Sequence, residues 1–142
     1  DLDPAKWKIN SNLIDYFILN QPNQDVKKMN FNKTGQMCGK YFRKLPCSIF
    51  RRTLHNGQIT NREWLLYSLS ANALFCFQCL LFCNRKSNLG NLKFGLKNWG
   101  KCEEKVKCHE EGQQHSESIR IWFSRTQKNA NSIDTVLYEE MK

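Results

Sequence analysis

The sequence predicts a small α+β domain in which a β-hairpin precedes C-terminal helices and an N-terminal helical segment extends the fold. Three observations support this class. Apolar residues recur at helical spacing near both ends of the chain, and two strand-like runs flank a polar turn near its middle. The length of 142 residues suits one domain.

The N-terminal helix is predicted after Asn10 or Ser11, either of which can cap it. Leu13, Ile14, Phe17 and Ile18 then follow helical spacing, and Pro22 marks the end. Residues 21–37 are polar and rich in Asn, Gln and Lys, so we expect a loop there.

The hairpin is predicted from residues 64–69 paired with residues 73–77. Bulky, strand-favouring side chains fill both runs, and Ser70–Asn72 supplies a turn between them. An earlier turn is expected at Asn56–Gly57. In this hairpin Cys76 and Cys79 lie at the far end of the second strand.

Two or three helices are predicted toward the C-terminus. A short one covers residues 97–108 with Trp99 pointing inward, and a stronger one covers residues 113–127. The tail at 132–141 favours a further short helix. In the strong helix one face carries four residues that we expect to point to the core: His115, Ile119, Trp122 and Phe123.

The domain organisation follows from these elements. We expect an N-terminal lead-in and helix over 1–36, a metal-binding domain over 37–128, and a helix or linker over 129–142. The chain starts without Met, and we interpret it as part of a longer protein with a further domain downstream. No apolar run of about 18 residues occurs, so no membrane partner is expected.

The residues that carry chemistry are Cys76-x2-Cys79 followed by His109-x5-His115. Two thiolates and two imidazoles satisfy tetrahedral zinc, and the cysteine spacing is typical of zinc sites. The prediction is one structural Zn²⁺ at a ββα-like metal core. Four protein ligands would close the shell and leave no position for a catalytic water. No enzymatic activity and no small-molecule substrate are therefore expected.

Other interpretations of the cysteines stay open. Seven cysteines form an odd number, without a secretion signal, which disfavours a disulfide framework. Cys76 and Cys79 could form a redox pair, although the βαβ setting of that motif is missing, or could be inert core residues. Cys83, Cys102 or Cys108 could also replace one of the four assigned ligands.

The net charge of +9 is concentrated on both sides of the cysteine pair, and residues 37–62 hold six Lys or Arg and no acid. Basic residues interleaved with aromatics are typical of nucleic-acid surfaces, although a solvated basic surface is the plainer interpretation. The candidate phosphate contacts are Arg43, Lys44, Arg51, Arg52, Arg62, Lys93, Lys97, Lys101 and Lys105.

Three stretches suggest a family: "NGQITNREWLLYSLSANALFCFQCLLF", "GLKNW" and "HEEGQQHSESIRIW". They resemble the TTF-type zinc finger of hAT-family transposases and of proteins domesticated from them, including zinc finger MYM-type proteins. The resemblance implies a nuclear, zinc-dependent module that binds double-stranded DNA and precedes a separate catalytic domain. It marks the same four zinc ligands. Gln78 and Asn98 depart from the family pattern, which often has Pro and an acidic residue there.

The sequence therefore supports two functional hypotheses. The first is a zinc-stabilised module that binds duplex DNA through the basic residues named above. The alternative is a zinc-stabilised protein-interaction module without direct DNA contact, because fold alone does not decide between these functions.

Overall fold

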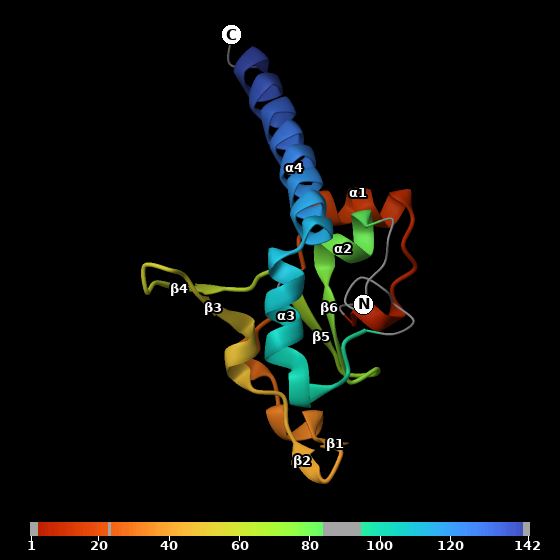
Figure 1. The fold of residues 1–142 in the computed structure, drawn as a ribbon. Helices are drawn as coiled ribbons and strands as arrows, with labels where there is room; N and C mark the ends of the chain where they lie inside the picture. The colour runs from red at the N-terminus through yellow and green to blue at the C-terminus, as the bar shows by residue number, and fades with distance from the viewer. Residues whose placement is uncertain (1–2, 23, 84–94, 141–142) are drawn as a thin grey trace.

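The computed structural model describes residues 3–22, 24–83 and 95–140 of the chain. The predicted α+β class is confirmed, with antiparallel hairpins in the middle of the chain and helices at the C-terminus (Figure 1). The elements in chain order are η1 (Pro4–Lys6), α1 (Ser11–Leu19), η2 (Val26–Lys28), η3 (Phe31–Thr34), β1 (Gln36–Cys38), β2 (Tyr41–Arg43), η4 (Cys47–Phe50), β3 (Arg51–Thr53), β4 (Ile59–Asn61), β5 (Leu65–Ser68), β6 (Ala73–Cys76), α2 (Phe77–Phe82), η6 (Trp99–Lys101), α3 (Cys102–Glu111) and α4 (Gln113–Glu140).

The strands form three separate antiparallel pairs: β1 with β2, β3 with β4, and β5 with β6. The predicted central hairpin is β5–β6, in which Leu65 pairs with Cys76 and Ser68 with Ala73. Every residue of both strands is buried. Uninterrupted apolar runs favour this position, because a strand covered on both faces cannot tolerate alternating polar residues.

The edges of the central hairpin are covered rather than left open. Backbone hydrogen bonds in both directions join Leu74 of β6 to Leu96. On the β5 side the carboxamide of Gln24 bonds both backbone groups of Tyr67, accepting from its N–H at 2.9 Å and donating to its carbonyl at 3.1 Å. Both interactions satisfy backbone groups that would otherwise be exposed along a strand edge.

The N-terminal helix is confirmed as α1, and Asn10 caps it by accepting a hydrogen bond from the Leu13 N–H at 2.8 Å. Phe17 of α1 packs with Trp7 against Phe77 and the neighbouring residues of α2. α4 contacts both α1 and α2, and its Trp122 packs edge-on against Phe77 of α2. These contacts form one of two apolar clusters in the described part of the chain.

The second cluster surrounds the cysteine pair and includes Leu45, Phe50, Trp64, Trp99 and Val106. Trp99 points inward as predicted, and its indole N–H donates to the Thr34 carbonyl at 2.6 Å. This bond ties η6 to the segment before β1, so residues far apart in sequence meet beneath α3 (Figure 1).

Three expectations about local structure were wrong. Residues 21–37 are not an open loop but contain η2, η3 and the start of β1, because Asp25 and Asn30 each cap a short 3₁₀ turn. The tail is not a separate helix, since α4 continues without a break to Glu140. Phe123 does not face the core and is 56% exposed, whereas Ser118 is buried in that stripe.

None of the helices in the described residues combines the length and apolar character that crossing a membrane requires.

Candidate metal centre

The structure brings Cys76, Cys79, His109 and His115 together in one cluster, whose four ligand atoms all lie within 4.8 Å of one another. Cys76 ends β6 and Cys79 lies in α2, while the histidines come from the end of α3 and the start of α4. The cluster therefore joins the central hairpin to the C-terminal helices.

Local structure explains how each pair converges. β6 passes directly into α2, with Cys76 in extended conformation as the N-cap, so the chain turns between the two thiols. Gly112 lies between α3 and α4 and its N–H bonds the His109 carbonyl at 3.1 Å. This break redirects the chain, so that His109 and His115 meet despite belonging to different helices.

The distances fit a tetrahedral ion. Sγ of Cys76 lies 3.4 Å from Nδ1 of His115, and Sγ of Cys79 lies 3.4 Å from Nε2 of His109. Zinc bonds of about 2.3 Å to sulfur and about 2.0–2.1 Å to nitrogen place neighbouring ligand atoms about 3.3–3.8 Å apart. Four protein ligands would fill every position, which is the arrangement of a structural site.

The site is shielded by the indole of Trp64. Its ring centroid lies 4.6 Å from that of His115 and 5.4 Å from that of His109, and Trp64 is buried. The two cysteines are also buried. Because three of the four ligands are buried and only His109 is half-buried, competition from solvent for the metal is reduced.

The two thiols differ in acidity. Burial, together with the hydrogen bond and charge of neighbouring Cys79, raises the pKa of the Cys76 thiol well above its usual value. The hydrogen bond from Cys76, helped by those from His109, His115 and Ser118, lowers the pKa of Cys79 to about 3 against the effect of burial. The lowered pKa of Cys79 favours its thiolate, which is the form of cysteine that binds metal.

Sequence reasoning missed the role of Glu110, which follows His109. Its carboxylate, 6% exposed, accepts hydrogen bonds from Trp64 Nε1 at 3.2 Å and from Arg62 Nε at 3.1 Å. Arg52 Nε also lies 3.3 Å away. Glu110 thus fixes the indole that covers the metal ligands. The sequence contains no signal for this role, since an acid beside a histidine is commonplace.

The same contacts correct the interpretation of Arg62 as a phosphate contact. Its side chain is only 10% exposed, pairs with Glu110, and donates to the carbonyls of Ile49 and Arg51. Arg52 is committed in part by its own pair with Glu110. Arg62 therefore holds the fold together rather than offering its charge to a ligand.

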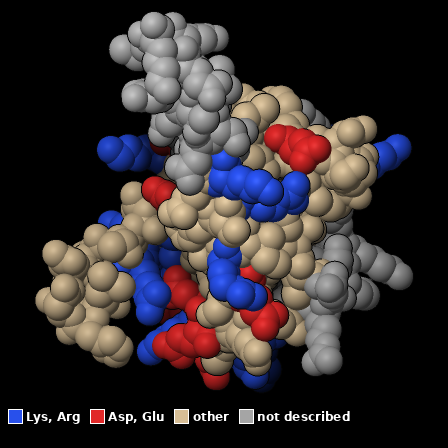
Figure 2. Space-filling model, turned by 90° about the horizontal axis from the view of Figure 1, so that it is seen from above, with Lys and Arg blue, Asp and Glu red and all other residues tan. Residues whose placement is uncertain are grey.

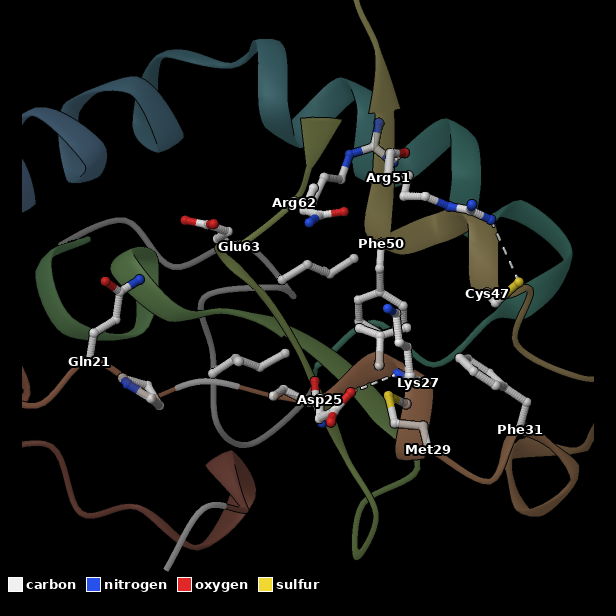
Figure 3. Close-up of a pocket in the computed structure, with 16 residues that line it drawn as sticks. Gln21, Asp25, Lys27, Met29, Phe31, Cys47, Phe50, Arg51, Arg62 and Glu63 are labelled. Carbon is white, nitrogen blue, oxygen red and sulfur yellow. Dashed lines mark hydrogen bonds between the residues drawn. The ribbon is translucent and has the colours of Figure 1, made fainter. Parts of the chain in front are cut away.

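Arg62 also lines a hollow of about 1000 Å³ beside β5. Its wall includes apolar side chains such as Met29 and Phe50, and its charged groups are of both signs (Figure 3). Arg51 lies at this hollow, where its guanidinium reaches Sγ of Cys47 at 3.8 Å (Figure 3).

The remaining predicted DNA contacts divide by position. Lys93 lies outside the described residues. Three of the others, Arg43, Lys44 and Lys101, line a second hollow of about 610 Å³, which the acidic first turn of α3 also borders. Six side chains are exposed and form no ion pair within the described part of the chain: Arg43, Lys44, Arg51, Lys97, Lys101 and Lys105.

The cysteines considered as replacement ligands lie apart from the cluster in the described structure. Cys108 is exposed although it adjoins His109, because it lies on a different face of α3. Cys102 is buried in the apolar core near Cys38. Cys83 is half-buried, and its thiol lies 3.6 Å from the Gln114 carboxamide.

Comparison with known proteins identifies relatives that are named as zinc finger proteins. The chain is 34% identical over 116 residues to zinc finger MYM-type protein 5 of Mus musculus, covering 80% of this chain and 17% of that protein. The proteins of the same name from Macaca fascicularis and Homo sapiens are 37% identical over 117 residues, covering 80% of this chain and 16% of each relative. Over this stretch the chain is similar to zinc finger MYM-type protein 5, and the similarity indicates a MYM-type-like zinc finger domain.

This chain thus spans about a sixth of the length of the curated relatives it matches. No family model matches it, and no solved structure does. The MYM-type-like domain has a donor set of two thiols and two imidazoles at zinc-like spacing, and its relatives are zinc fingers. Its cofactor is therefore zinc.

Proposed function

We propose that this domain is the DNA-binding module of a hAT-type transposase or of a protein derived from one, and that it acts in the nucleus on double-stranded DNA. The motifs that resemble the TTF-type zinc finger support this origin. The module itself performs no catalysis in this proposal, because zinc with four protein ligands lacks the open position that catalytic sites keep.

The observation that carries the proposal is the set of six exposed, unpaired cations defined above. Nucleic-acid affinity is dominated by phosphate contacts from such side chains, since each contact releases condensed counterions. Arg43, Lys44 and Lys101 line one hollow, so three of the six cations are close enough together to contact the same stretch of phosphate backbone. The face seen in Figure 2 mixes Lys and Arg with Asp and Glu.

Zinc contributes by fixing the scaffold. It links β6 and α2 to α3 and α4, and α3 begins directly after Lys101. The fold that zinc stabilises in this way keeps the basic side chains, such as Lys101 just before α3, in fixed positions.

The test is fluorescence anisotropy of the zinc-loaded protein with labelled duplex DNA at about 50 and 200 mM salt. If all six cations contact phosphate, affinity should fall about 10³-fold across this range. A domain that shows no binding at the lower salt concentration would contradict the proposal.

A protein-interaction module is the second candidate. Large apolar side chains are exposed on the helices, including Tyr16 and Leu19 of α1 and Phe123 of α4. Such residues favour contact with another protein when they gather in one patch. The absence of DNA binding in the test above, with the fold and zinc intact, would favour this candidate.

A further inference from the structure

The β1–β2 ribbon, residues 36–43, projects from the end of the molecule opposite the C-terminal end of α4 (Figure 1). Gly39 lies at its tip with a φ of +64°, a conformation that glycine adopts without strain. A two-stranded β-ribbon has the cross-section that enters the major groove of B-DNA.

The ribbon carries large apolar side chains that the fold leaves uncovered. Met37, Tyr41 and Phe42 are 64%, 69% and 61% exposed. Met37 and Phe42 are paired in register, so they lie side by side on one face of the ribbon. The Phe42 ring lies so close to Gly35 that a Cβ there would collide with it. Gly35 thereby makes room for the ring in this position.

The charge of the ribbon favours a polyanion over an apolar protein surface. Lys40 lies beside the tip, and Arg43 and Lys44 follow at the base. The sequence from residue 37 to residue 62 contains no acid. Lys44 donates to the Asn32 side chain at 2.9 Å, a neutral partner that leaves its charge available.

The base of the ribbon is attached to the core. The Gln36 carboxamide oxygen accepts a hydrogen bond from the Trp99 N–H at 3.4 Å, and Gly100 lies against Cys38 and Arg43. Trp99 is itself buried and hydrogen-bonded to the Thr34 carbonyl, so η6 holds the base of the ribbon against the core. A DNA-contacting element held in this way loses little conformational entropy on binding.

We propose that the β1–β2 ribbon enters the major groove of duplex DNA, with Met37 and Phe42 facing base edges and Lys40, Arg43 and Lys44 contacting the flanking phosphates. The inference rests on the DNA binding proposed above. Phe42 would contact thymine methyl groups, an apolar contact that only the major groove offers.

The test separates the two kinds of contact by their salt dependence. Phe42→Ala should weaken duplex binding about 10-fold at every salt concentration while leaving the salt slope unchanged. The double variant Lys40→Ala/Lys44→Ala should instead reduce the slope of log K against log salt by about 1.8, which is about 0.9 for each phosphate that a lysine no longer neutralises.

Matched control variants test whether the loss of affinity and the change in salt slope are specific to the ribbon. Phe123→Ala makes the same change at a similarly exposed position, 56%, on α4, and should bind as the wild type does. Lys6→Ala/Lys8→Ala removes two exposed lysines near the N-terminus and should retain the slope. Zinc content and circular dichroism of each variant should equal those of the wild type, since every substituted residue is exposed.

The groove is tested by replacing thymine with deoxyuridine, which removes the methyl groups. Wild-type affinity should fall, and the Phe42→Ala variant should show a smaller loss, because it no longer makes that contact. Equal losses in both proteins would overturn the major-groove assignment.

The outcomes distinguish the two proposals. Steep, salt-dependent binding by the wild type with unchanged binding by both ribbon variants would overturn the inference about the ribbon and leave DNA binding standing. The exposed ribbon would then be a surface for a protein partner. No binding by the zinc-loaded wild type would overturn both.

Discussion

The position of a cysteine relative to the zinc cluster decides whether that cysteine can be a metal ligand. Cys76 is fully buried and its sulfur lies 3.4 Å from the His115 ring nitrogen, whereas Cys108 is exposed beside His109. Adjacency in sequence places Cys108 next to a ligand, but the helix directs its side chain elsewhere. The contrast provides a pair of variants that differ only in access to the metal.

We expect Cys76→Ser to lose zinc and to unfold at 25 °C, because structural zinc contributes about 10–16 kcal/mol of apparent binding free energy. Cys108→Ser should retain one zinc per chain. Metal content by atomic absorption and thermal unfolding by circular dichroism check both. Loss of zinc from Cys108→Ser, with zinc retained by Cys76→Ser, would show that the ligand set is wrong.

Among the elements, α3 is connected to the β3–β4 hairpin by one carboxylate. Glu110 pairs with Arg62, at the end of that hairpin, and with Arg52 inside it, and also holds the Trp64 indole. Three donors converge on this side chain, so its buried charge is well compensated. Removal would leave Arg62 buried without its acid.

Glu110→Ala should lower the free energy of unfolding by about 3–5 kcal/mol. This is the cost of removing one partner of a buried ion pair and leaving the other charge buried without it. The neighbouring Glu111 is exposed at the end of α3, so Glu111→Ala should change stability by less than about 0.5 kcal/mol. Urea denaturation of the zinc-loaded proteins measures both. Similar stabilities for the two variants would refute the role assigned to Glu110.

At the scale of the whole molecule, two apolar clusters share the region around the cysteine pair. Cys76 and Cys79 belong to one cluster, and Phe77 and Leu80, each of which directly follows one of these cysteines in the chain, belong to the other. α4 likewise supplies His115 to the metal site and Trp122 to the cluster that contains Trp7 and Phe17. The metal therefore stabilises elements that build both clusters.

Chelation of zinc should consequently disrupt both clusters in one transition, since the metal's contribution is comparable to the whole net stability of a small domain. Near-ultraviolet circular dichroism reports on the buried tryptophans of both, Trp64 and Trp99 in one and Trp7 and Trp122 in the other. Survival of the Trp7–Phe17 packing after chelation would show instead that the N-terminal cluster folds independently.

The sequence by itself determined the elements whose causes are local. Helix α1 and its Asn10 cap, the β5–β6 hairpin and the inward Trp99 all follow from spacing, capping and turn chemistry within a few residues. The zinc cofactor was also predictable, because a tetrahedral ion needs two pairs of ligands and the chain presents both.

Only the tertiary structure decided the roles that depend on distant partners. Arg62 and Lys44 are both basic residues in an acid-poor segment, yet one is consumed by Glu110, 48 residues away, and the other stays exposed. Phe123 follows Trp122 on the apolar side of α4, yet Trp122 is buried and Phe123 is exposed. Local pattern specifies which face a residue occupies, whereas the partner that covers or pairs with that face comes from elsewhere in the chain.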